Sequence, residues 1–157
     1  MSDFLKQITS LLKSTPDHAS QLPAVLQAVL GEFSSETATV HRLDPSNQVL
    51  HLVAQIGLPP GLLDIVKTIP VGKGIAGQTV VCGGPVTICN LQTDTSGIAK
   101  PGARQTGVGG ALSVPIHKMD AIVGTLGIGT RREHEFTAAE TAQLEAVANL
   151  LGEFGLT

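Results

Sequence analysis

The sequence predicts an α+β fold, in which helices at the two ends of the chain are separate from a central antiparallel sheet. Three observations predict it. Residues 4–33 carry apolar side chains at helical spacing, residues 37–130 carry short β-branched runs divided by turn signals, and residues from 137 on return to helical spacing. Helices and strands therefore do not alternate along most of the chain, as they do in parallel α/β folds.

The chain has the length and composition of one globular domain. It has 157 residues, of which 42% are hydrophobic and 15% charged, so it can bury a core and is not expected to be disordered. We predict a single domain over residues 1–157, with an N-terminal helix over residues 1–14 and the core over residues 19–151.

Charge and composition argue against several classes of partner. The net charge is −3 and aromatic residues make up only 3%, so nucleic acid is not an expected partner. The N-terminus lacks a secretory pattern, and no apolar run approaches the roughly 20 residues that span a bilayer. Two cysteines are too few for a disulfide framework. We expect a cytoplasmic protein without a membrane partner.

Two helices are predicted in the first part of the chain. In the first, residues at i, i+4, i+7 and i+8 spacing form an apolar face: Phe4, Ile8, Leu11 and Leu12. After a break at residues 14–17, a second apolar stripe consists of Leu22, Val25, Leu26, Val29, Leu30 and Phe33. Pro23 fits the first turn of this helix, where an amide has no partner to lose.

The remaining elements are defined by turn and cap signals. Residues 44–47 and 118–120 are the predicted turns of two β-hairpins. Gly83 is expected to end a short helix in the left-handed conformation. Thr137 and Glu140 form a predicted capping box at the start of the last helix. The predicted strands are residues 37–43, 49–54, 86–88, 111–117 and 122–130, and the predicted short helices are residues 62–66 and 75–81.

Residues 89–109 are predicted to form a long polar loop, and loops of this length are usually functional. Mixed hydrogen-bond donors with two cations suit a small anion or carboxylate. The alternative is that these side chains cap and turn their own loop, with Asp94 clamped to Arg104. The candidate ligand-binding residues are Asn90, Thr93, Asp94, Ser96, Lys100, Arg104, Thr106 and Gly107.

Other candidate sites have simpler interpretations. Cys82 and Cys89 could be redox partners or half of a metal site, but no nearby histidine completes a zinc set, so we expect buried, inert thiols. His41 and His51 form a weak metal pair, and only if the hairpin register brings them together. The glycine run at residues 72–77 lacks the Gly-Lys-Ser/Thr ending of a phosphate loop. No catalytic constellation is visible, so we do not expect an enzyme.

Several blocks in order resemble the GAF family of cytoplasmic sensory domains, which is related to PAS domains. The resemblance runs from about Ala19 to Leu151. It is carried by residues 70–77 (PVGKGIAG), 84–86 (GPV), 107–116 (GVGGALSVPI), 123–128 (VGTLGI) and 136–137 (FT). It implies an antiparallel sheet of about five to six strands, with the terminal helices on one face and a lid of loop and short helices on the other. The ligand pocket of such domains lies between the sheet and the lid. The loop is also similar to that of GAF proteins related to bacterial nitrate-sensing regulators.

The sequence departs from the subclasses of the family whose ligands are best understood. Neither cysteine is followed by the histidine of tetrapyrrole-binding members, and the Asn-Lys-x-Asp signature of cyclic-nucleotide binders is absent. There is no haem signature. Free methionine sulfoxide reductases use a set of cysteines that Cys82 and Cys89 match poorly. Asn90 stands where many members have aspartate, so a role that needs that carboxylate is in doubt. The cofactor stays open.

The resemblance implies a sensory domain that binds a small polar ligand and signals through its terminal helices to a separate partner, such as a kinase or a transcription regulator. Family members often dimerise through these helices, so we expect a homodimer that uses the last helix together with Leu5, Leu12, Leu22 and Leu26. The alternatives are a thiol-dependent reductase of a small sulfoxide and a ligand-free interaction module.

Overall fold

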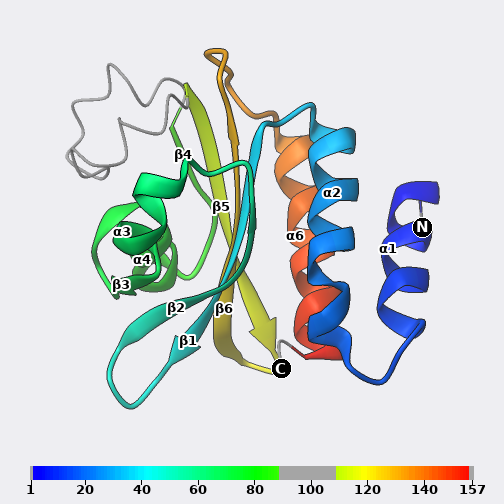
Figure 1. The fold of residues 1–157 in the computed structure, drawn as a ribbon, viewed down its shortest axis with the longest axis horizontal. Coiled ribbons are helices and arrows are strands. Elements are labelled where there is room, and N and C mark those ends of the chain that lie inside the picture. The colour runs from blue at the N-terminus through cyan, green and yellow to red at the C-terminus, as the bar shows by residue number, and fades with distance from the viewer. Residues whose placement is uncertain (1, 89–108, 156–157) are drawn as a thin grey trace.

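A computed structural model describes residues 2–88 and 109–155 and has the predicted α+β architecture (Figure 1). A six-stranded sheet has the order β3-β2-β1-β6-β5-β4, and every neighbouring pair is antiparallel. The strands are β1 (Thr37–Asp44), β2 (Val49–Ile56), β3 (Thr68–Pro70), β4 (Val86–Ile88), β5 (Gly110–Lys118) and β6 (Ala121–Thr130). The fold class and both hairpins are confirmed.

The helices lie in two groups on opposite sides of the sheet (Figure 1). One group contains α1 (Asp3–Lys13), α2 (Leu22–Phe33) and α6 (Ala138–Phe154). The other group contains α3 (Leu63–Val66) and α4 (Gly74–Cys82), together with the 3-10 turn η2 (Pro60–Leu62). A second 3-10 turn, η1 (His18–Gln21), joins α1 to α2. The predicted lid helices therefore lie on the face opposite the terminal helices.

The terminal helices form two layers rather than one. Helices α2 and α6 cover the sheet, whereas α1 packs on α2 and α6 and lies outside them (Figure 1). Phe4, Ile8 and Leu12 supply the buried face of α1, and Phe4 meets Phe33 of α2 edge to face with ring centroids 6.1 Å apart. Helix α2 is therefore enclosed between the sheet and α1, which accounts for its strongly apolar sequence.

Three of the predicted dimer residues belong to the core of the chain itself. Leu12, Leu22 and Leu26 are each no more than 1% exposed and pack in one cluster with both sheet-facing helices. The prediction that these three side chains form a dimer interface is therefore wrong. An apolar stripe shows that a helix face is buried, but the second helical layer of this fold buries it within one chain.

Local signals at the helix ends are confirmed. Thr137 accepts a hydrogen bond from the Glu140 N–H (3.1 Å), and Glu140 Oε1 accepts one from the Thr137 N–H (2.9 Å), which completes the capping box. Gly83 ends α4 at φ 69°, the left-handed conformation that glycine adopts without steric cost. Pro23 lies in the first turn of α2.

Candidate ligand-binding face

All eight predicted ligand-binding residues lie outside the described residues, as does Cys89: Asn90, Thr93, Asp94, Ser96, Lys100, Arg104, Thr106 and Gly107. The described part of the chain nevertheless includes the sheet face and the short helices that the resemblance places around the pocket. We call the side of the sheet that carries α3 and α4 the lid face. Its side chains alternate along each strand with those of the hydrophobic core.

Helix α4 is held near the sheet by a glycine contact. A Cβ on Gly77 would lie 2.7 Å from the carbonyl oxygen of Pro70 and 2.9 Å from the Gly72 nitrogen, so only glycine fits. The Gly72 N–H donates to the Gly77 carbonyl (3.1 Å), and Gly72 has φ 90°. The structural interpretation of the glycine run at residues 72–77 is therefore correct: it turns the chain after β3 and packs α4 against that turn.

A row of small and polar residues crosses the lid face. Cross-strand pairing places Gln55, Thr39, Gly127 and Ser113 side by side on neighbouring strands. Directly opposed residues point to the same face, and Leu112 and Val114 on either side of Ser113 belong to the core. Gly127 carries no side chain, and a Cβ there would lie 3.1 Å from Thr39 Oγ1. Because Gly127 has no side chain, the Thr39 hydroxyl lies close over its backbone, and Ser113 pairs with Gly127 on the other side.

His41 lies in the next row of the same face and is 3% exposed. Its neighbours in that row are Leu52 on β2 and Thr125 on β6. His41 Nε2 lies 2.9 Å from the carbonyl oxygen of Val66, at the end of α3. Burial lowers the pKa of His41, and the Val66 hydrogen bond opposes that shift only in part. The imidazole is therefore neutral near neutral pH.

Two buried side-chain atoms on this face have no hydrogen-bond partner. Among the described residues, His41 Nδ1 and Ser113 Oγ are the buried polar side-chain atoms left unpaired. Ser113 is 3% exposed, as is His41. Native proteins pair almost all such atoms, so each exception calls for an explanation. The sequence shows a histidine and a serine within β-branched runs, but only the register shows that both face the lid.

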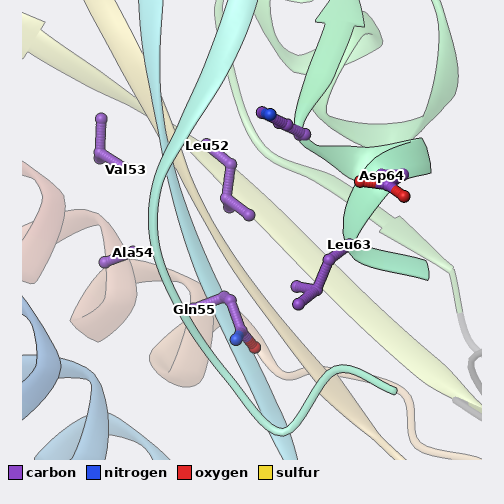
Figure 2. Close-up of a pocket in the computed structure, with 7 residues that line it drawn as sticks. Leu52, Val53, Ala54, Gln55, Leu63 and Asp64 are labelled. Atoms are coloured by element: carbon purple, nitrogen blue, oxygen red, sulfur yellow. The ribbon is translucent and has the colours of Figure 1, made fainter. Parts of the chain in front are cut away.

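An open groove lies between β2 and α3 and reaches the row of His41 (Figure 2). It has a volume of about 290 Å³ and is lined by Leu52, Val53, Ala54, Gln55, Leu63, Asp64 and Lys67. Figure 2 shows Leu52 and Leu63 facing one another across it, with Asp64 at its rim. The groove is therefore open and mainly apolar, and it includes the charged residues Asp64 and Lys67 in its lining.

The cysteine and histidine predictions have different outcomes. Cys82 is exposed at the end of α4, so the expectation of a buried thiol is wrong for this residue. His51 pairs with Arg42, whereas His41 pairs with Leu52, so the two histidines lie on opposite faces of the hairpin. No group of three metal-binding side chains occurs among residues 2–88 and 109–155.

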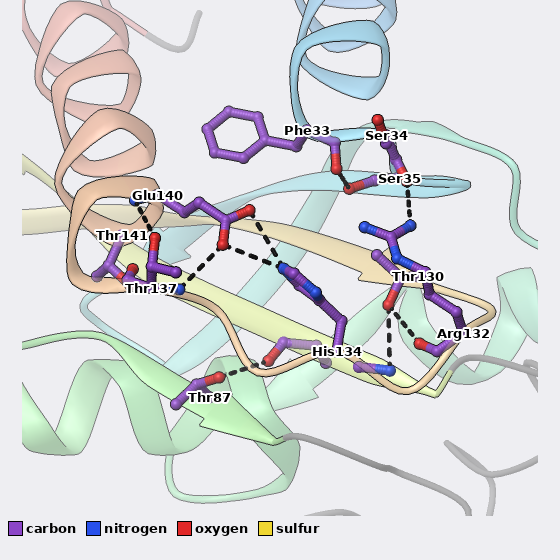
Figure 3. A network of polar contacts seen from close by, with 12 residues as sticks. Phe33, Ser34, Ser35, Thr87, Thr130, Arg132, His134, Thr137, Glu140 and Thr141 are labelled. Carbon is purple, nitrogen blue, oxygen red and sulfur yellow. Dashed lines mark hydrogen bonds and ion pairs between the residues drawn. The ribbon is translucent and has the colours of Figure 1, made fainter.

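The connection between β6 and α6 is held by a network of hydrogen bonds (Figure 3). Buried Thr130 donates from Oγ1 to the Arg132 carbonyl (2.7 Å) and accepts from the Gly110 N–H (3.3 Å). The Arg132 guanidinium donates to the carbonyl of Ser34, which ends α2 (2.8 Å). Gly110 begins β5, so this connection joins the start of β5 to the end of α2.

The same connection reaches the first turn of α6. His134 Nε2 lies 3.1 Å from Glu140 Oε1 (Figure 3). The His134 ring meets Phe136 edge to face, with centroids 4.6 Å apart. Partial burial raises the pKa of Glu140, but hydrogen bonds from Thr137 and His134 outweigh it, so the pKa lies below its usual value. The charged sequence of residues 131–135 gives no local signal for these contacts.

Comparisons with known proteins support this architecture. A free methionine-R-sulfoxide reductase from Neisseria meningitidis, solved with its substrate, superposes with a TM-score of 0.81 at 19% identity, covering 97% of this chain and 86% of that one. The GAF domain of an Acinetobacter phosphoenolpyruvate-protein phosphotransferase gives 0.81 at 20% identity, covering 98% and 94%. A putative GAF sensor protein from Burkholderia vietnamiensis gives 0.80 at 18% identity, covering 97% and 90%.

These similarities show the fold, and the matched proteins include a reductase, a GAF domain of a phosphotransferase and a putative GAF sensor. No curated protein matches the chain by sequence. None of the helices in the described part is long and apolar enough to cross a membrane. The model of the GAF domain family matches residues 17–154, nearly the whole chain. The chain belongs to the GAF domain family.

Proposed function

We propose that this chain is a regulatory domain that binds a small polar ligand between its sheet and its lid helices. The observation that carries the proposal is the pair of buried, unpaired polar atoms on the lid face, His41 Nδ1 and Ser113 Oγ. A bound polar molecule would satisfy such atoms, and binding sites combine apolar walls with a few convergent polar groups. The open groove beside Leu52, whose partner on β1 is His41, supplies an apolar wall.

The loop residues predicted from the sequence add a second set of ligand contacts to this proposal. Lys100 and Arg104 would supply positive charge to an anionic group of the ligand, and Thr93, Ser96 and Thr106 would supply hydroxyl groups. Ligand binding would then shift the packing of the terminal helices and so inform a separate protein, such as a kinase or a transcription regulator. The network between Gly110, Thr130 and α6 is a physical connection that supports this route.

Native mass spectrometry of freshly purified protein tests the proposal. We expect a carried-over mass that is lost on mild denaturation. Ser113→Ala should reduce its occupancy, since it removes one of the two unpaired groups. Ser46→Ala, in the exposed turn between β1 and β2, is the matched control and should retain the mass. Ligand retention that is equal in Ser113→Ala and the control would contradict the proposed site.

A second candidate function is a thiol-dependent reductase. Two observations favour it: Cys82 is exposed, and solved free methionine-R-sulfoxide reductases share the fold. A catalytic thiol would be largely thiolate near neutral pH and would react quickly with an alkylating reagent. Labelling at several pH values, with Cys82→Ser and Cys89→Ser as controls, measures this. Thiols that react no faster than free cysteine would exclude the reductase.

The homodimer is also retained as a proposal, with a changed interface. Among the described residues, the large apolar side chains that are exposed are Val53, Ile65, Val81 and Met119, and none of these lies on α1, α2 or α6. A dimer through the helices would therefore use partly buried residues such as Leu5 and Leu11 of α1. Light scattering at high protein concentration tests it, and a monomeric mass would exclude it. A protein that carries no ligand and has unreactive thiols would leave the interaction module as the remaining function.

A further inference from the structure

The two ring nitrogens of His41 have different roles that the structure fixes. Nε2 lies 2.9 Å from the Val66 carbonyl oxygen, and a carbonyl oxygen can only accept a hydrogen bond. Nε2 therefore carries the single proton of the neutral imidazole. Nδ1 then has a free lone pair and acts as an acceptor. This assignment follows from the partner of Nε2 and selects the neutral tautomer that is protonated at Nε2.

The acceptor at Nδ1 is buried without a donor. His41 is 3% exposed, and no described residue donates a hydrogen bond to Nδ1. Its neighbours on the lid face are Leu52, which lines the groove, and Thr125, which is 1% exposed. A metal ion on Nδ1 would need further ligands, and the described residues contain no group that could provide them.

We propose that the ligand donates a hydrogen bond to His41 Nδ1. This inference rests on the proposed function and restricts the ligand to molecules with an N–H or O–H group, such as an amide, an alcohol or an ammonium compound. A ligand that offers only acceptors, such as nitrate or a simple carboxylate, would leave Nδ1 unpaired. Sites built around a buried hydrogen-bonding group discriminate against analogues that lack the complementary group.

Two small amides test the inference because they differ in a single donor. N-methylacetamide has an N–H group, whereas N,N-dimethylacetamide has a second methyl group in its place and the same carbonyl. Nitrogen-15 spectra of the histidine side chains report the protonation and hydrogen bonding of each ring nitrogen. Each amide is titrated into ligand-free protein, and the His41 Nδ1 signal and the backbone amide signals of the lid face are followed.

The matched variant is His41→Gln. Its side-chain amide nitrogen can take the place of Nε2 and donate to Val66, but glutamine has no acceptor at the position of Nδ1. We expect wild-type protein to bind N-methylacetamide about two- to tenfold more tightly than N,N-dimethylacetamide, which is the range of one neutral hydrogen bond. His41→Gln should bind the two amides equally.

The outcomes separate the inference from the proposed function. Equal binding of the two amides to wild-type protein, or an Nδ1 signal that does not respond to N-methylacetamide, would overturn the donor inference and leave the ligand site in place. An Nδ1 that is protonated or already hydrogen-bonded in ligand-free protein would overturn it as well. No response to either amide anywhere on the lid face would count against the proposed site itself.

Discussion

Gly152 of α6 lies directly against the carbonyl oxygen of His117 on β5, so closely that a Cβ on Gly152 would overlap that oxygen. The contact brings the last helix onto the sheet near its hairpin end. Because the obstructing atom belongs to the backbone, it cannot rotate away as a side chain would. Helix α6 therefore packs at this distance only with glycine at position 152.

The first prediction concerns this contact. Gly152→Ala should lower the free energy of unfolding by about 1–3 kcal/mol, because the helix must move away from β5. Gly31→Ala is the matched control, since Gly31 lies in the exposed part of α2 and its Cβ would meet no atom within 4 Å. That control should be stabilising by about 0.5–1 kcal/mol through helix propensity. Urea denaturation measures both, and a neutral Gly152→Ala would contradict the packing described.

The second prediction is a pH dependence set by His41. Burial lowers its pKa from 6.5, so the unfolded chain takes up a proton at a higher pH than the folded chain does. The contribution of the neutral ring to stability is fully present above pH 6.5 and is lost progressively as the pH falls below 6.5. The denaturant concentration at the midpoint of unfolding should therefore decrease as the pH is lowered from about 7 to about 5. His41→Gln should remove most of this slope, and an equal slope in the variant would assign it to other groups.

The third prediction separates stability from binding at Ser113. In ligand-free protein the buried hydroxyl has no partner, so replacing it with a methyl group removes an unpaired polar group. Ser113→Ala should therefore raise the free energy of unfolding by about 1 kcal/mol. Thermal denaturation of protein freed of ligand measures the change. A destabilised variant would show that the hydroxyl already has a partner in the free protein.

The fourth prediction tests the link at Thr130. Thr130→Val keeps the side-chain shape but removes the hydrogen bonds to Gly110 and Arg132, at a cost of about 1–3 kcal/mol. Amide exchange should become faster at Gly110 and also at Ser35 and Glu36, next to the Arg132 contact at Ser34. Thr68→Val, on exposed β3, is the control and should change neither site. Faster exchange confined to Gly110 would show that the network does not connect β5 to α2.

The sequence predicted those parts of the fold that depend on neighbouring residues. The capping box of Thr137 and Glu140 and the left-handed Gly83 were predictable because each is set by chemistry within a few residues. The hairpins were predictable for the same reason, since their turns join strands that are adjacent in the chain. Their observed ends extend the predicted ones by one or two residues.

Features that depend on distant residues were not predictable. The lid-face row requires Thr39 to lie opposite Gly127, and no local signal fixes the register between β1 and β6. The stripe containing Leu26 indicated a buried face without showing that α1 covers α2. Exposure of Cys82 depends on how α4 lies on the sheet. Ligand binding by the eight loop residues stays a prediction.

The position of Cys82 has a practical consequence for experiments on this protein. The thiol is exposed at the end of the helix that borders the candidate site, away from α1 and α6 (Figure 1). In a Cys89→Ser background, a fluorescent dye or a spin label can be attached there without adding a cysteine. Its emission or mobility would follow the surroundings of α4 as compounds are added. Screening for the unidentified ligand can then start from a residue that the protein already has.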